Sequence, residues 1–320
     1  MSISFEPPLR KAPISIFPFL FLRLQSISKL KTSTPHPTIL PPNSTMIEKT
    51  ENRLDLPISV IYRDEEWFVI DKPYDCKIQN YPNSTEATVE SILKQQFPEV
   101  SKFRNVHQLD YATSGVFVLA LNKKAAAEAS KLFRERLVKK TYIALVNGHL
   151  SDNSYFVDKP IAEDPNHAFR MRIDEEGKPA QTNIEVLERG YYTFKEVQTG
   201  QQKSIPATKV KLSPISGRRH QLRLHLKHIG HPIIGDYNYE DIYTDTFRMM
   251  LHAYQITLPL LEKDKEKALT ITATDPFIHL LSTADIKFPE MDVTFAGEVQ
   301  FKRAIKYIIV DYICKAVEKS

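Results

Sequence analysis

The sequence has few cysteines, no phosphate-binding glycine motif and no long apolar run, and each absence excludes a class of protein. Cys76 and Cys314 lie far apart and form neither a CxxC pair nor a disulfide framework, which is typical of proteins in reducing compartments. Neither GxGxxG nor a P-loop occurs, so we expect no nucleotide cofactor. The apolar run at 14–22 is too short to cross a bilayer, so we expect no membrane partner. These absences favour the cytoplasm or the nucleus.

The amino-terminal residues 1–50 are rich in proline and serine and are expected to form a disordered or targeting tail. Within residues 1–45, five basic residues oppose Glu6 alone, which accounts for the net charge of +4. A basic segment that bears serine is typical of mitochondrial presequences, whereas its prolines would break the amphipathic helix that such a signal needs. A mitochondrial location and a plain extension both stay open, and Met46 is a second candidate for the start of translation.

Two later stretches carry local positive charge, although the chain beyond the tail is neutral. Residues 203–231 hold seven Lys/Arg, four His and no acidic residue, and residues 123–140 hold seven Lys/Arg against two Glu. Clustered basic side chains are typical of surfaces that contact nucleic-acid phosphates. The alternative is that both stretches are solvated helix faces.

Short strands alternate with a few helices along the middle of the chain. Periodicity predicts helices at 88–96, 125–137 and 219–229, and strands at 58–73, 116–121, 140–148, 182–187, 208–212, 255–258 and 268–274. This mixture indicates an α+β fold with a largely antiparallel sheet. The stretch 297–320 is a candidate amphipathic helix, so residues 289–320 are expected to form a helical extension.

Asp110 lies on a short loop that leads into a predicted buried strand. It follows His107-Gln108-Leu109 and precedes a small polar turn, after which residues 116–121 form an apolar run. Catalytic groups are often found on loops that a rigid element holds in place. The alternative is that Asp110 caps a turn formed by Thr113 and Ser114. This segment by itself does not decide between the two.

A second segment, 217–236, combines an apolar helical face with basic residues. Leu222 and Leu226 share one predicted helical face. Arg219 and Arg223 share another, where their like charges repel mildly, and a nearby carboxylate or phosphate would relieve this repulsion. The histidines of the segment have basic neighbours and no acidic ligand close in sequence, so we expect no metal site.

These two segments resemble the signature motifs of the RluA-like family of RNA pseudouridine synthases, His-Arg-Leu-Asp-x-x-Thr-Ser-Gly and Gly-Arg-x-His-Gln-(Leu/Ile)-Arg-x-His. Three further segments are similar to family elements in the same order, namely Val69–Pro73, Lys140–Gly148 and Leu251–Ala253. The resemblance covers residues 56–288. It implies one catalytic domain with the pseudouridine synthase fold, a mixed, mostly antiparallel sheet with flanking helices. It also implies isomerisation of uridine to pseudouridine in RNA without a cofactor.

The resemblance further implies the roles of three residues. Asp110 is the single carboxylate, which either adds to the sugar or base or acts as a base at C2′. Arg223 matches the family arginine that pairs with this carboxylate, and a guanidinium keeps a carboxylate ionised and oriented. Tyr142 matches the active-site tyrosine, whose ring can stack on the base and whose hydroxyl can serve proton transfer. The target base must leave the RNA stack to reach Asp110.

A wider set of residues is expected to bind the substrate, a transfer, ribosomal or messenger RNA, with the protein acting as a monomer. This set comprises His107, Gln108, Leu109, Thr113, Lys139, Lys140, Arg218, His220, Gln221 and Leu251. Gln108 departs from the family, which has an arginine that fills the space of the flipped base and touches phosphates. Because an amide carries no charge, an RNA-binding protein or RNA folding aid without catalysis remains the alternative function.

Overall fold

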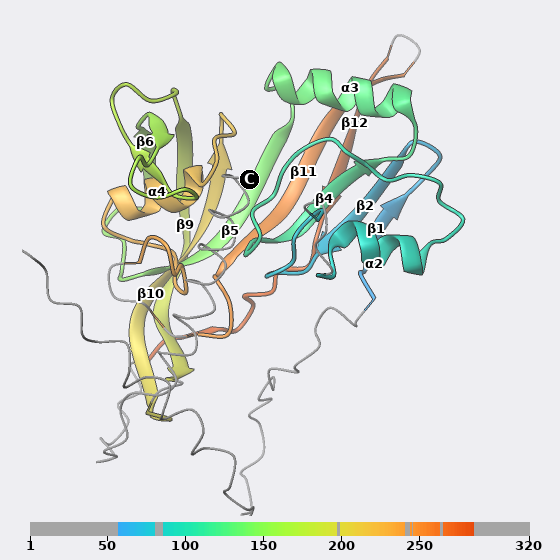
Figure 1. The fold of residues 1–320 in the computed structure, drawn as a ribbon. Coiled ribbons are helices and arrows are strands. Elements are labelled where there is room, and N and C mark those ends of the chain that lie inside the picture. Colours follow the sequence, from blue (N-terminus) through green and yellow to red (C-terminus); the bar gives the residue numbers. More distant parts are fainter. Residues whose placement is uncertain are drawn as a thin grey trace, which may run out of the picture. The chain divides into compact units, whose positions relative to one another are not determined.

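The computed structural model describes residues 57–80, 86–196, 199–240, 244, 246–262 and 265–284, all of which belong to one compact unit of the chain (Figure 1). The predicted tail at 1–50 and the predicted extension at 289–320 lie outside the described residues. In the described part of the chain, no helix is long and apolar enough to cross a membrane.

Most of the strands join one mixed sheet. In chain order the elements are β1 (Val60–Arg63), β2 (Trp67–Lys72), α2 (Val89–Gln96), β3 (Arg104–Asn105), β4 (Ser114–Ala120), α3 (Lys123–Arg134), β5 (Lys139–Asn147), β6 (Ser154–Asp158), β7 (Ile161–Glu163), β8 (Met171–Ile173), β9 (Gln181–Lys195), β10 (Gln202–Pro214), α4 (Gln221–His228), β11 (Leu251–Glu262), β12 (Lys265–Thr272) and β13 (Leu281–Ser282).

The order of the main sheet is β1-β2-β4-β11-β5-β10-β9-β13, and β3, β6 and β12 pair with β4, β9 and β11. Among these described strands the pairs are antiparallel, except that β4 and β11 run parallel. Strands β7 and β8 form a separate two-stranded sheet. The arrangement confirms the predicted α+β class with a mixed, mostly antiparallel sheet.

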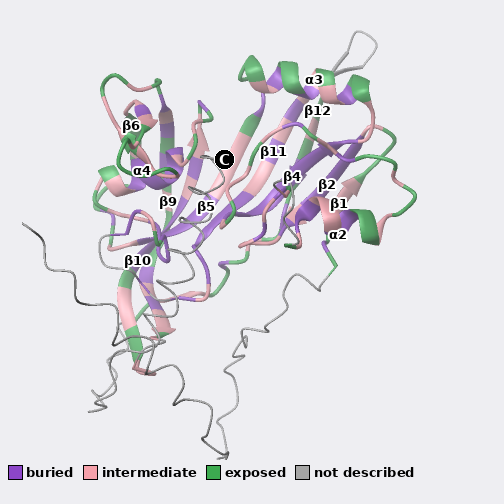
Figure 2. Ribbon diagram, in the orientation of Figure 1, coloured by how far each residue is buried: buried purple, intermediate pink, exposed green. Residues whose placement is uncertain are grey.

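The strands β2 and β4 are buried along their whole length or nearly so, because helices cover both faces of this half of the sheet (Figure 2). In β2, Trp67 and Val69 belong to the apolar cluster that contains α3, whereas Phe68 and Ile70 belong to the cluster that contains α2. Strands covered on both faces are continuous apolar runs in sequence. This packing gives a rigid support to the loop that bears Asp110.

Gly115 allows β4 to approach β11 closely at the parallel pair. Its φ is +108°, and a Cβ atom there would lie 2.2 Å from the carbonyl oxygen of Ala253. Both the backbone conformation and the lack of space therefore exclude a side chain. The close approach connects the turn that follows Asp110 to the strand that bears Leu251.

The helix α4 packs against the other half of the sheet. Leu222 and Leu226 join the apolar cluster of β5, β9 and β10, as the sequence predicts. The helix begins two residues later than predicted, because His220 adopts a left-handed conformation with φ 55°. Arg219 consequently precedes the helix, so the predicted helical face shared by Arg219 and Arg223 is wrong.

Candidate active site

Asp110 is on the loop between β3 and β4, and backbone hydrogen bonds hold this loop in a tight turn. The backbone N–H of Thr113 donates to the carbonyl oxygen of Asp110, with an N···O distance of 3.1 Å. The carbonyl oxygen of Tyr111 accepts from the backbone N–H of Cys76 at 3.2 Å. The Asp110 side chain is 27% exposed. The carboxylate is thus fixed by its turn and still open to a substrate.

Lys72, at the end of β2, holds the same turn from within the protein. Its buried Nζ donates to the carbonyl oxygens of Pro73, Cys76 and Tyr111 at 2.8, 2.9 and 3.1 Å. Burial lowers the pKa of Lys72 to about 8, although negative groups including Asp110 oppose this shift. Sequence reasoning had placed Lys72 in a motif without giving it a role. A lysine at the end of a buried strand was the available signal.

Arg223 links Asp110 to a second carboxylate, which is buried. Its Nε and Nη2 donate to Asp236 at 2.8 and 2.7 Å, and its Nη1 donates to Oδ2 of Asp110 at 3.3 Å. The bidentate contact fixes the plane of the guanidinium, and the ring of Tyr239 lies 4.9 Å from the guanidinium carbon. Burial disfavours the charge of Arg223, but attraction to Asp236 and Asp110 outweighs burial and raises its pKa above the ordinary value. The cation beside Asp110 is therefore permanent.

Asp236 and Tyr239 are the parts of this arrangement that sequence reasoning missed. Asp236 is the last residue of the segment 217–236, but nothing local to its position shows that it orients Arg223. The hydroxyl of Tyr239 forms a hydrogen bond with Nδ1 of His220 at 2.7 Å. The same hydroxyl accepts from the backbone N–H of Met171 at 2.8 Å. These contacts tie the residues after α4 to the residues before it.

His220 lies beside Asp110 as an uncharged ring. Its Nε2 is 3.9 Å from Oδ2 of Asp110. Burial, and after it the charge of Arg223, lowers the pKa of His220 to about 4. The ring is therefore neutral at pH 7, and Arg223 supplies the positive charge next to the carboxylate.

Tyr142 enters the site from β5. Burial, and after it the negative charge of Asp110, raises the pKa of Tyr142 above its ordinary value. The phenol is therefore protonated at neutral pH and can donate a hydrogen bond. A small cavity of about 10 Å³ adjoins it and is lined by His107, Val116, Lys140, Tyr142, Ala253, Gln255 and Ile256.

His107, predicted to bind substrate, has its ring among protein groups. Its Nε2 accepts from the backbone N–H of Val118 at 2.9 Å, and the ring stacks on Phe133 with centroids 5.0 Å apart. Burial, and after it the charge of Lys140, lowers the pKa of His107 to about 3. The ring thus supports the strand β4 that follows Asp110, and a contact with RNA stays a prediction.

Three other predicted substrate-binding residues, Thr113, Gln221 and Leu251, are buried. The amide of Gln221 accepts from the backbone N–H of Arg218 at 3.0 Å and donates to the carbonyl oxygen of Gln181 at 2.9 Å. Gln221 therefore anchors the start of α4 to β9. Leu251 pairs with Ala144 on the neighbouring strand β5. Ala144 is two residues from Tyr142 and therefore lies on the same face of β5.

The remaining predicted substrate-binding residues are open to solvent to different degrees. Gln108 and Lys139 are exposed, whereas Leu109, Lys140 and Arg218 are partly buried. Nζ of Lys140 donates to the carbonyl oxygen of Ser216 at 3.4 Å. Burial, followed by the charge of Arg136, lowers the pKa of Lys140. The structure therefore leaves Gln108 and Lys139 the most accessible of this set, and their role stays a prediction.

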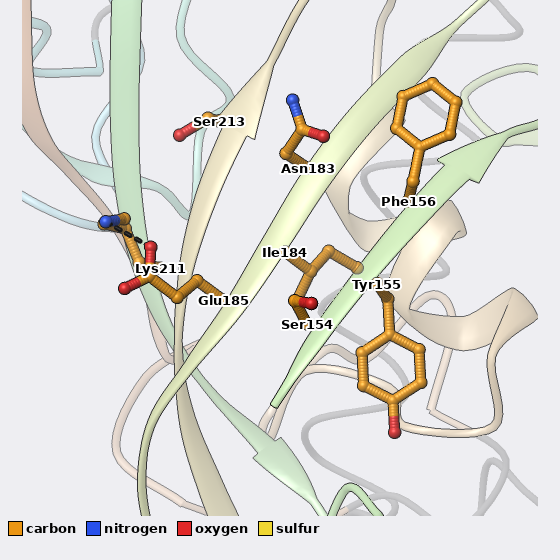
Figure 3. Close-up of a pocket in the computed structure, with 8 residues that line it drawn as sticks. All are labelled: Ser154, Tyr155, Phe156, Asn183, Ile184, Glu185, Lys211 and Ser213. Atoms are coloured by element: carbon orange, nitrogen blue, oxygen red, sulfur yellow. Dashed lines mark ion pairs between the residues drawn. The ribbon is translucent and has the colours of Figure 1, made fainter. Parts of the chain in front are cut away.

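A groove of about 370 Å³ between β6, β9 and β10 is separate from this cluster (Figure 3). It is lined by Ser154, Tyr155, Phe156, Asn183, Ile184, Glu185, Lys211 and Ser213. Its charged groups, Lys211 and Glu185, pair with each other. Among the described residues, no group of three or more His, Cys, Asp or Glu side chains is placed to hold a metal ion.

On this α+β sheet an accessible carboxylate thus lies beside a fixed guanidinium, and a protonated tyrosine enters the same site. The chain belongs to the RNA pseudouridylate synthase family, whose model matches residues 66–228. Members of this family are isomerases that convert uridine to pseudouridine in RNA. The family expected from the motifs is thus confirmed.

Individual relatives agree with this assignment. The chain is 39% identical to RNA pseudouridylate synthase domain-containing protein 1 of Danio rerio over 239 residues, which cover 70% of this chain and 76% of the relative. It is 38% identical to the dual-specificity RNA pseudouridine synthase RluA of Yersinia pestis over 202 residues, covering 62% of this chain and 91% of the relative. Gln108 and residues 247–253 also indicate a similarity to domain-containing protein 1, which this comparison confirms.

Solved structures show the same relationship. Human RNA pseudouridylate synthase domain containing 1 matches with a TM-score of 0.59 and 32% identity, over 78% of this chain and 94% of the other. Human RNA pseudouridylate synthase domain containing 4 matches with a TM-score of 0.52 and 25% identity, over 68% and 88% of the two chains. The pseudouridine synthase fold implied by the motifs is confirmed.

Proposed function

We propose that this isomerase converts uridine to pseudouridine in structured RNA with Asp110 as its one catalytic carboxylate. The observation that carries the proposal is the contact of 3.3 Å between Nη1 of Arg223 and Asp110, with Arg223 itself fixed by Asp236. In this reaction the N1–C1′ bond breaks, the uracil turns, and C5 joins C1′. A carboxylate serves by adding to the sugar or base, or as a base at C2′. In both routes the carboxylate acts as an anion, and the adjacent guanidinium orients it.

Tyr142 has a supporting role in this proposal. Its ring offers a stacking surface for the extruded uracil, and its protonated hydroxyl donates a hydrogen bond. Because its pKa is raised, Tyr142 is protonated at neutral pH and cannot accept a proton from the substrate as it stands. To act as a base, Tyr142 must first give its hydroxyl proton to another acceptor. The target uracil can reach this site only after it leaves the RNA stack.

The substitution Asp110→Asn tests the role of the carboxylate, because it keeps the shape of the side chain and removes its charge. Purified wild-type and variant proteins are incubated with total cellular RNA, and pseudouridine is mapped by carbodiimide modification and sequencing. We expect no detectable isomerisation by Asp110→Asn, while RNA affinity stays within a few-fold of wild type. The matched control is Asp152→Asn, an exposed acid elsewhere in the chain, which we expect to retain full activity.

Two outcomes would contradict this proposal in different ways. Turnover by Asp110→Asn would show that another residue carries the chemistry. Binding of RNA by the wild-type protein without formation of pseudouridine would instead support the alternative, a protein that binds or folds RNA on the same fold.

A further inference from the structure

An exposed aromatic ring follows the carboxylate of Asp110 directly in the chain. Tyr111 is 46% exposed. It occupies the second position of the turn that Asp110 begins, because the N–H of Thr113 donates to the carbonyl oxygen of Asp110. The backbone of Tyr111 is nevertheless fixed, since its carbonyl oxygen accepts from the N–H of Cys76 and from Nζ of Lys72. An exposed ring is thus carried by a fixed backbone one residue after Asp110.

The guanidinium beside Asp110, that of Arg223, is buried at 5% exposure, whereas two other side chains close to Asp110 in sequence or space are uncharged. Gln108, two residues before Asp110, is exposed and carries an amide. His220 is neutral at pH 7 because its pKa is about 4. An exposed aromatic ring is suited to the π-face of a nucleic-acid base rather than to a phosphate.

Extrusion of a uridine breaks the stacking of its neighbours in the RNA. A base that loses its neighbour gains from a new stacking partner, and an aromatic side chain provides one for any base. Tyr111 is placed for this role because the reacting uridine must come to Asp110. The Cα atoms of Asp110 and Tyr111 are joined by one peptide unit and lie about 3.8 Å apart.

We propose that Tyr111 is a base-stacking residue, which binds a nucleotide next to the target uridine and so stabilises the RNA with its base extruded. This proposal rests on the proposed function for the identity of the RNA site. It adds a contact through which the chain selects RNA that is unpaired beside the target. Stacking of this kind requires the ring and does not require the phenolic hydroxyl.

The test uses a synthetic stem-loop RNA whose loop contains uridines, with 2-aminopurine on the 3′ side of one of them. The fluorescence of 2-aminopurine falls when it stacks on an aromatic ring. We expect the full-length wild-type protein, Tyr111→Phe and Tyr111→Trp to quench this probe on binding. Tyr111→Ala is expected to lose the quench and to bind roughly 5-fold to 100-fold more weakly, as the loss of one base–aromatic stack implies.

Phe156→Ala is the matched control, since Phe156 is a 58% exposed ring in the separate groove beside β6. It should leave both the quench and the affinity unchanged. The melting temperature of each variant shows whether it folds. If Tyr111→Ala does not fold, Tyr111→Leu replaces it in the test, because leucine is a large side chain without an aromatic ring.

The proposal is overturned if the wild-type protein shows no quench that depends on Tyr111, or if the alanine and leucine variants quench and bind as the wild type does. Such a result together with normal formation of pseudouridine would leave the proposed function intact. Conversely, a quench that depends on Tyr111 in a protein that forms no pseudouridine would refute the proposed activity and leave the stacking site.

The substitution Gln108→Arg sharpens the same test. A guanidinium can fill the space of an extruded base and bind a phosphate, which an amide does more weakly. We expect Gln108→Arg to restore part of the RNA affinity lost in Tyr111→Ala, with a larger gain on a structured stem-loop than on a loose single strand, where the base already lies outside a stack. The absence of any rescue would show that the two side chains act on different steps.

Discussion

Two stretches of this chain, 203–231 and 123–140, hold seven lysines and arginines each, yet the fold uses their charges differently. In the stretch 203–231, four of the seven basic side chains form ion pairs within the protein, namely Lys203 with Glu196, Lys209 with Asp275, Lys211 with Glu185, and Arg223 with Asp236 and Asp110. The absence of acidic residues from the stretch itself does not leave its cations without partners. Acids from neighbouring strands and from the loop after α4 supply them.

The stretch 123–140 turns most of its cations to solvent. Lys123, Lys131, Arg134 and Lys139 are exposed, and Lys124 pairs with Glu66 at 3.5 Å while remaining 83% exposed. An exposed pair of this kind contributes little to stability. The number of basic residues in a stretch of sequence therefore does not measure how much positive charge is free on the surface to bind a partner. We expect α3 and the start of β5 to contribute more to RNA affinity than the stretch 203–231.

The largest effect is expected where a cation of the paired stretch belongs to the active site. Arg223→Gln leaves Asp236 buried without its partner, which we expect to cost about 3–5 kcal/mol of unfolding free energy and to abolish turnover. Arg223→Lys keeps the charge and loses the planar fork, so turnover should fall roughly 10-fold to 100-fold, as the loss of a charged hydrogen bond implies. Urea denaturation and turnover measured on both variants check this prediction. Full activity of Arg223→Gln would mean that Asp110 does not need the guanidinium.

The second prediction concerns a paired cation outside the active site. Lys209 is 8% exposed, and its Nζ lies 2.5 Å from Oδ2 of Asp275. Lys209→Met keeps the aliphatic bulk but leaves Asp275 without its counter-charge, so we expect a loss of about 3 kcal/mol of unfolding free energy. RNA affinity and its dependence on salt should not change. A weaker salt dependence in this variant would place RNA phosphates on this stretch and break the comparison.

The histidines of the paired stretch provide a test by pH. Burial is the largest cause that lowers the pKa of His220, to about 4, and of His225. Below pH 6.5 the unfolded chain therefore binds more protons than the folded one, and stability is lost as the pH falls from 6.5 toward 4. The expected slope is about 1.4 kcal/mol per pH unit for each ring that titrates this way.

Urea denaturation at pH 7, 6 and 5 measures this slope. His225→Gln should reduce it, whereas His167→Gln, a change at an exposed position, should not. A slope that is the same in all three proteins would show that His225 is not the origin of the acid sensitivity.

The smallest expected change in free energy lies on the solvent side of α3. Lys131→Ala combined with Arg134→Ala should leave the unfolding free energy within about 0.5 kcal/mol of wild type. RNA affinity should weaken, and the slope of log K against log salt should fall by roughly 1 for each phosphate contact removed. Lys139→Ala combined with Lys140→Ala should act in the same direction without changing which uridine is modified.

Lys203→Ala is the control from the paired stretch, since Lys203 is exposed but bonded to Glu196. It should leave the salt slope unchanged. An equal loss of slope in Lys203→Ala and in the α3 double variant would show that pairing within the protein does not remove a cation from RNA binding.

Much of the fold and of the site could be predicted from local patterns. The α+β class, the three helices and the strand that bears Tyr142 follow from the spacing of apolar residues, whereas the strand predicted at 255–258 begins earlier, at Leu251. The start of α4 could not be predicted, because His220 takes a left-handed conformation while its ring bonds to Tyr239, a contact outside the helix. The spacing of residues in the sequence therefore predicts a helix that includes Arg219, whereas the helix in the structure begins at Gln221.

The sequence by itself determined the family, the reaction class and the candidate carboxylate, because these depend on residue type and order along the chain. The family motifs already implied that Arg223 pairs with Asp110, but only the tertiary structure decided how the other charges meet and how deeply each is buried. Arg223 reaches Asp110 across 113 positions and Lys209 reaches Asp275 across 66, and Lys72 bonds to Tyr111 across 39. Burial and distance set the energy of a charge, and both arise only when distant segments pack together. For this reason the same residue type is a fixed partner of the carboxylate at Arg223 and a solvent-exposed cation at Arg134 on α3.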